Sequence, residues 1–148
     1  MPFDNYFVIV PIVYKLLIGA LARRDLEQIW RSDPEAAGVL EAGLQHIKSD
    51  QQLLDSLTIK DFGAHGTETI HVDTWVEQQR EGRNLWRFKH WELESQGRKY
   101  RVVYALDPRV SCYYVLGIFS RDFNYDLNDP RTQRVIEAYD RLGIPSYR

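Results

Sequence analysis

Three consecutive strand-like segments in the second half of the chain constrain its fold more than any other feature. Residues 85–94, 99–106 and 111–120 are rich in aromatic and β-branched side chains, which fit a pleated surface. Short turns that contain Gly97 and Pro108 separate these segments. Because turns of this length join antiparallel neighbours, this half of the chain predicts a β-meander.

Helices are predicted before and after the meander. Residues 14–31 show helical spacing, and Asp33 and Pro34 then end that helix and start a second one, as a cap and a first helical residue. The apolar stripe of the second helix consists of Val39, Leu40, Leu44 and Ile47. A last helix over 129–142 ends at Gly143. The first two helices therefore form an antiparallel hairpin.

The remaining segments complete an α+β domain. Residues 5–10 are typical of a strand, 49–66 of a connector, 69–76 of an additional strand and 78–84 of a turn. The order predicts a small antiparallel sheet, a meander of three to four strands plus an N-terminal strand, with an N-terminal helical hairpin and a C-terminal helix on one sheet face. The length of 148 residues predicts a single domain over 1–148.

The apolar stretch at residues 7–22 favours a buried start of the fold over an export signal. No basic region precedes it, and Lys15 lies inside it. The stretch is shorter than the ~20 residues needed to span a bilayer, and Pro11 interrupts it. A lone Cys112 cannot form an internal disulfide. We expect a cytoplasmic protein without a membrane partner, with export as the alternative.

The meander carries a positive charge that the whole chain does not. The net charge is −2, which excludes an overall attraction to nucleic acid, yet residues 80–121 hold nine Lys and Arg against four Asp and Glu. Aromatic side chains alternate with these cations, an arrangement that suits phosphates and stacked bases of single-stranded nucleic acid. The alternative is a set of solvent-facing charges that keep the sheet soluble.

Several of these segments resemble the RelE/ParE superfamily of toxin–antitoxin toxins. The strand at 100–104, with the sequence YRVVY, and the VLGI run at 115–118 are similar to the family's most recognisable signature. Arg121 followed by Tyr125 is similar to the late arginine and tyrosine of RelE-type ribosome-dependent nucleases. The segment 64–83 lies outside the resemblance.

The resemblance implies a toxin-like endoribonuclease, an mRNA interferase, that cuts ribosome-bound mRNA without a metal or other cofactor. The ribose 2′-hydroxyl attacks the adjacent phosphate and leaves a cyclic phosphate and a free 5′-hydroxyl. The expected partners are a cognate antitoxin protein, which neutralises the toxin, and the ribosome with its mRNA. A ParE-like inhibitor of DNA gyrase and a non-catalytic interaction module on the same fold remain as alternatives.

The resemblance also assigns catalytic roles to Arg101, Arg121, Tyr125 and Lys89. A guanidinium stays charged and grips phosphate oxygens in pairs, which suits the arginines for stabilising the transition state. Tyr125 could orient the substrate, stack on a base or deliver a proton. The residues expected to bind RNA are Arg87, His90, Arg98 and Lys99.

The strand at 85–94 leaves two arrangements open. A period of two puts Arg87 and Lys89 on one face and His90 and Glu92 on the other, so both sets cannot line one site. We favour the electrostatic cradle of Arg87 and Lys89 over an acid–base pair of His90 and Glu92. The histidines expected to be ordinary surface or packing residues, without metal-ligand spacing, are His46, His65 and His71.

Overall fold

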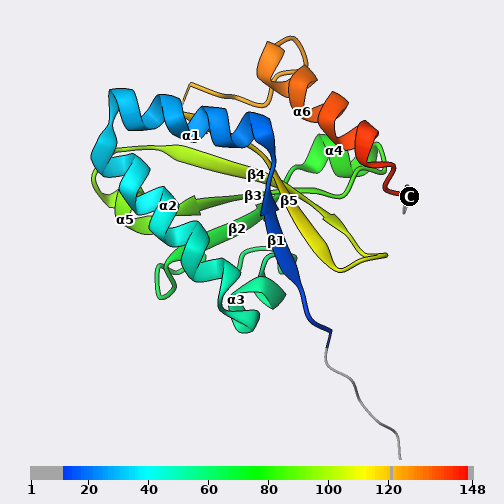
Figure 1. Cartoon of the computed structure of the whole chain (residues 1–148), viewed down its shortest axis with the longest axis horizontal. Helices are drawn as coiled ribbons and strands as arrows, with labels where there is room; N and C mark the ends of the chain where they lie inside the picture. Colours follow the sequence, from blue (N-terminus) through cyan, green and yellow to red (C-terminus); the bar gives the residue numbers. More distant parts are fainter. Residues whose placement is uncertain (1–11, 121, 147–148) are drawn as a thin grey trace, which may run out of the picture.

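The protein is built around one mixed β-sheet with helices on both sides (Figure 1). The computed structural model describes residues 12–120 and 122–146, and these contain five strands and six helices, which confirms the α+β class. None of these helices has the length and apolar character needed to cross a bilayer. The elements in chain order are β1 (Lys15–Ile18), α1 (Ala20–Ser32), α2 (Pro34–Lys48), α3 (Gln51–Ser56), β2 (Ile70–Thr74), α4 (Val76–Arg80), β3 (Leu85–His90), α5 (Trp91–Ser95), β4 (Tyr100–Asp107), β5 (Cys112–Ser120) and α6 (Pro130–Leu142).

The strands lie in the order β1-β5-β4-β3-β2. β3, β4 and β5 form the predicted antiparallel meander, and β2 confirms the additional strand expected at 69–76. The sheet is mixed rather than purely antiparallel, because β1 runs parallel to β5 at its edge. Arg87 lies opposite Val103 and Phe88 opposite Val102, and this register determines which side chains share a face.

The helical hairpin forms as the sequence predicts. Asp33 joins the two helices, and its side chain accepts a 3.2 Å hydrogen bond from the backbone N–H of Ala36. Pro34 occupies the first position of α2, where a backbone N–H has no partner within the helix. In Figure 1 the hairpin lies to one side of the strands.

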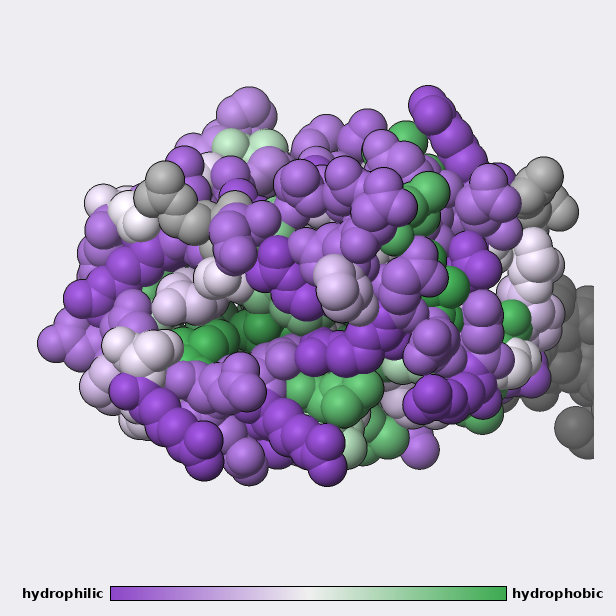
Figure 2. Space-filling model, turned by 90° about the horizontal axis from the view of Figure 1, so that it is seen from above, coloured by the Kyte–Doolittle hydropathy of each residue, from purple (hydrophilic) through white to green (hydrophobic). Residues whose placement is uncertain are grey.

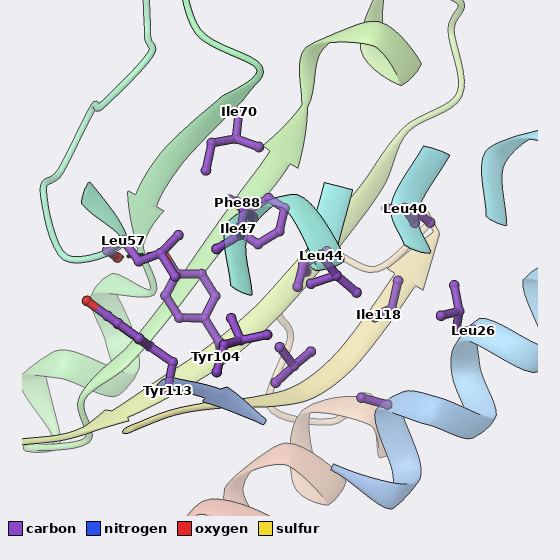
Figure 3. Packing of buried hydrophobic residues seen from close by; sticks show 14 of the residues in the cluster. Leu26, Leu40, Leu44, Ile47, Leu57, Ile70, Phe88, Tyr104, Tyr113 and Ile118 are labelled. Carbon is purple, nitrogen blue, oxygen red and sulfur yellow. Dashed lines mark hydrogen bonds between the residues drawn. The ribbon is translucent and has the colours of Figure 1, made fainter. Parts of the chain in front are cut away.

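One face of the sheet packs against the hairpin and α3. Leu44 and Ile47 of α2 lie near Phe88 of β3 in one apolar cluster (Figure 3). At the centre of this cluster the Tyr104 hydroxyl donates a 2.6 Å hydrogen bond to the carbonyl of Leu57. This bond gives the buried phenol a partner and ties the segment after α3 to the sheet.

The opposite face packs against α6. Val135 and Tyr139 of this helix contact Val103 and Leu116 in a second apolar cluster. The Tyr139 hydroxyl accepts a 2.9 Å hydrogen bond from the backbone N–H of Asn84. The prediction that all helices cover one face is therefore wrong. β4 sends successive apolar side chains to both clusters, and a strand of this kind needs cover on both faces.

The first strand and the first helix have different boundaries in the structure from those that the sequence predicts. The sequence predicts one helix over 14–31, whereas Lys15–Ile18 forms β1 and α1 begins at Ala20. Backbone pairing with β5 stabilises residues 15–18 as a strand despite their helical spacing. The strand expected at 5–10 lies outside the described residues.

Short helices replace parts of three other predicted segments. The strand expected at 85–94 ends at His90, and Trp91–Ser95 forms α5. Gly97 follows with a left-handed φ of 73°, which turns the chain back into β4. α3 and α4 occupy parts of the predicted connector and turn.

Replacing Leu44 by alanine should lower the free energy of unfolding by about 2–5 kcal/mol, because truncating a buried leucine leaves a cavity. Leu44 is 1% exposed, whereas Leu127 is 57% exposed. Urea unfolding measures the change, and Leu127→Ala is the matched control, with an expected change of about 0.5 kcal/mol or less. An equal loss in the two variants would contradict the packing described here.

Candidate functional site

Cationic side chains from two neighbouring strands gather in one hollow on the face that carries α6. Arg87 and Lys89 of β3 and Arg101 of β4 line this hollow, which has a volume of about 100 Å³. His71 and Asp73 of β2 complete its polar lining, since they lie opposite Lys89 and Arg87 in the β2–β3 register. We call this site the β2–β4 hollow. Its polar lining has three cations against one carboxylate, which favours an anionic ligand.

Arg87 connects the β2–β4 hollow to Tyr125. Its guanidinium carbon lies 4.4 Å from the centre of the Tyr125 ring, and its Nη2 lies 3.4 Å from Asp73 Oδ2. Tyr125 has a left-handed φ of 63°, a conformation that is uncommon for a side chain of this size. The segment after β5 therefore places the phenol beside the arginine at a cost in backbone strain.

The Tyr125 hydroxyl is buried and has no hydrogen-bond partner among the described residues. Burial raises the pKa of Tyr125 above its ordinary value, and the positive charge of Arg87 opposes that effect. The phenol therefore keeps its proton at neutral pH and can act as a hydrogen-bond donor.

Among the three cations of the hollow, Lys89 has the fewest partners within the protein that an anionic ligand would have to displace. Its Nζ lies 4.7 Å from the centre of the Trp91 ring, and no carboxylate of the described residues pairs with it. Trp91 is held in place because its Nε1–H donates a 2.8 Å hydrogen bond to the carbonyl of Gly63. Lys89 can therefore bind an anion without giving up an ion pair.

Arg101 already has partners within the protein. It forms an ion pair with Glu94 of α5, and its Nη1 donates a 2.9 Å hydrogen bond to the carbonyl of Tyr100. A guanidinium has five N–H donors in a fixed fork, so these contacts leave donors for a ligand. Glu94 holds the side chain in the hollow and also lowers its attraction for an anion.

His90 lies on the other side of the sheet. Its ring lies so near Gly43 of α2 that a Cβ there would be 3.2 Å from His90 Cδ2, and its Nδ1 is buried without a hydrogen-bond partner among the described residues. His90 therefore does not line the β2–β4 hollow with the cations, because successive residues of β3 point to opposite faces. The same geometry keeps the two sets apart: Arg87 and Lys89 line the β2–β4 hollow, and His90 and Glu92 lie together on the side of α2, near His46.

Two further predicted residues, Arg98 and Lys99, do not line the β2–β4 hollow. Arg98 is bound at the start of α2, where it lies 3.3 Å from Asp33 and 3.0 Å from Glu35. Lys99 is exposed at the turn before β4. Arg121 lies outside the described residues.

Sequence reasoning missed His71, Asp73 and the role of Trp91. A signal for the first two was present, because apolar and polar residues alternate along 69–76 and place His71 and Asp73 on one face. Only the pairing of β2 with β3 in the structure places these two side chains next to Lys89 and Arg87.

A second hollow, between α1 and α6, lacks this free positive charge. The surface seen from above is mostly hydrophilic, with hydrophobic residues recessed in a hollow and others scattered over it (Figure 2). The hollow between the two helices has a volume of about 230 Å³ and is lined in part by Phe119 and Arg131. Arg131 lies 2.6 Å from Asp129 and 3.1 Å from Asp122, so carboxylates neutralise it. The β2–β4 hollow is therefore the better candidate site.

Comparisons of the chain with family models, with curated proteins and with solved structures gave no match. Within residues 12–120 and 122–146, no three His, Cys, Asp or Glu side chains group together as metal ligands. The features that mark the candidate site are three cations that line one open hollow and a buried phenol that packs against one of them, Arg87.

Replacing Asp73 by asparagine should raise the affinity of the hollow for an anion by roughly two- to fivefold, the range of one exposed ion pair. The change removes the carboxylate that competes for Arg87 and keeps an oxygen for the 2.7 Å hydrogen bond from the backbone N–H of Thr74. Fluorescence anisotropy with a short single-stranded RNA measures the change in affinity. Asp55→Asn removes the same charge at an exposed position of α3, away from the hollow, and an equal gain in affinity there would count against the hollow as the binding site.

The buried position of His90 should make the protein less stable to unfolding in mild acid. Burial lowers the pKa of His90 below its ordinary value, and the charge of Glu92 opposes that shift. The unfolded chain therefore takes up a proton more readily as the pH falls below about 6.5, so the free energy of unfolding falls with it. Urea unfolding at several pH values should show a smaller loss in His90→Gln than in the wild type. An identical pH dependence would argue that His90 is solvated.

Proposed function

We propose that the protein is a metal-independent endoribonuclease of the RelE/ParE type, an mRNA interferase that acts on ribosome-bound mRNA. The observation that carries the proposal is the meeting of Arg87, Lys89 and Arg101 in one open hollow beside Tyr125. Phosphate groups are anions that guanidinium and ammonium groups bind well, so the hollow suits a phosphodiester. The aromatic ring of Trp91 next to Lys89 helps to hold that cation at the hollow.

The cations serve the charged transition state of 2′-hydroxyl attack. The 2′ oxygen forms a bond to phosphorus while the bond from phosphorus to the 5′ oxygen breaks, and negative charge increases on the phosphoryl oxygens. Arg87, Lys89 and Arg101 lie where they can bind those oxygens. Tyr125, whose buried hydroxyl keeps its proton, packs its ring against Arg87 and so helps to orient that guanidinium in the hollow.

The resemblance supports a cognate antitoxin as a second part of the proposal. A toxin that cuts mRNA stops growth unless a partner covers its site. Co-expression of a small neighbouring reading frame should therefore restore growth, and the purified pair should no longer cut RNA.

Lys89→Gln is the sharpest variant for the nuclease, because it leaves no carboxylate without a partner. We expect induced wild-type protein to cut transcripts during translation and to leave a 2′,3′-cyclic phosphate and a 5′-hydroxyl. Lys89→Gln should lower the rate of cutting roughly tenfold or more, and Arg101→Gln roughly 10²-fold, because each removes a charge from the transition state. Mapping of RNA ends after induction, and single-turnover cleavage on programmed ribosomes, measure these rates.

The control variant is Arg24→Ala, which removes an exposed arginine of α1 away from the hollow and should cut like the wild type. A 2′-deoxy nucleotide at the cleavage site should block the reaction, because it lacks the attacking hydroxyl. Intact transcripts at growth arrest would reject the nuclease, and DNA breaks trapped with gyrase in their place would support the ParE-like alternative.

A further inference from the structure

His71 is the group in the β2–β4 hollow for which the proposed reaction has no role so far. It lies in β2, within the segment 64–83 that falls outside the family resemblance, and its side chain is 19% exposed. In the β2–β3 register it lies opposite Lys89, so it faces the same hollow as the cations.

Two contacts hold the imidazole in one orientation. The rings of His71 and Trp91 are stacked, with centres 5.7 Å apart and planes only 2° from parallel. On another side, Asp61 Oδ1 lies 3.5 Å from His71 Nε2. An imidazole held on two sides is preoriented for one reaction geometry.

The backbone holds Asp61 at that place. The N–H of Asp61 donates a 2.9 Å hydrogen bond to the carbonyl of Val72, and the N–H of Val72 donates one of 2.9 Å to the carbonyl of Phe62. Asp61 also has a left-handed φ of 64°, which is uncommon outside glycine. The loop before β2 thus pairs with that strand and presents a carboxylate to its histidine.

This arrangement determines which ring nitrogen is free. When Nε2 carries the proton and donates a hydrogen bond to the Asp61 carboxylate, Nδ1 of the neutral ring holds a lone pair. The other polar side chains of the hollow are less suited to accept a proton. Arg87, Lys89 and Arg101 are protonated cations, and Asp73 already accepts hydrogen bonds from Arg87 and from the backbone of Thr74.

We propose that His71 is the general base of the ribonuclease reaction and that Asp61 positions it; this inference rests on the proposed function. Nδ1 of His71 takes the proton of the 2′-hydroxyl as the 2′ oxygen bonds to phosphorus. The 5′ oxygen leaves with a proton from solvent, and the imidazolium then returns its own proton to solvent, so the reaction needs no further reactant. The cations of the hollow bind the phosphate meanwhile.

The experiment compares cleavage and RNA binding in His71→Ala, with His65→Ala as the matched control. His65 is an exposed histidine of the preceding loop and lies outside the hollow. We expect His71→Ala to cut RNA roughly 10²–10⁴-fold more slowly, the usual contribution of a general base, while its Kd for RNA stays within about twofold. Added imidazole should restore part of the rate in His71→Ala and change neither the wild type nor His65→Ala.

The outcomes separate the two proposals. A folded His71→Ala that cuts at the wild-type rate, or one whose lost rate follows lost RNA binding and does not respond to imidazole, would overturn the role of His71 and leave the nuclease in place. Wild-type protein that leaves RNA intact on programmed ribosomes overturns the proposed function itself. Lys89→Gln should show the opposite pattern to His71→Ala, with weaker binding and no rescue by imidazole.

Discussion

The two-residue period of β3 and β4 is the constraint on which the rest of the structure depends. Successive side chains of a strand point to opposite faces, so the register that sets Arg87 opposite Val103 sends Phe88 to the helical hairpin and Lys89 to the other side. A slip by one residue would bury the cations under α2 and expose Phe88. The same register therefore determines both the stability of the main core and the charge of the hollow.

Stability and anion binding compete within the hollow. Arg87 and Arg101 each keep a carboxylate partner, which reduces repulsion among three cations that share a small space. Those partners also weaken the attraction for a ligand. Lys89 has no such partner among the described residues and packs against Trp91, so it can bind a ligand without breaking an ion pair. A phosphodiester entering the hollow would satisfy all three cations together.

Features encoded by a few neighbouring residues were predicted well. Asp33 with Pro34 starts α2, Gly143 ends α6 with a left-handed φ of 67°, and Gly97 turns the chain before β4. Features that depend on distant pairing were predicted poorly. Lys15–Ile18 became a strand because β5 lies beside it, and α6 covers a second face because β4 is apolar on both sides.

The amino-acid sequence by itself determined that Arg87 and Lys89 share a face and that His90 does not, because alternation follows from the local geometry of any strand. Only the tertiary structure decided what that face meets. Pairing of β2 with β3 brought His71 and Asp73 to the cations, and packing against the start of α2 took Arg98 away from them. Contacts between residues far apart in the chain depend on strand register and helix placement, and neither can be predicted from a short stretch of sequence.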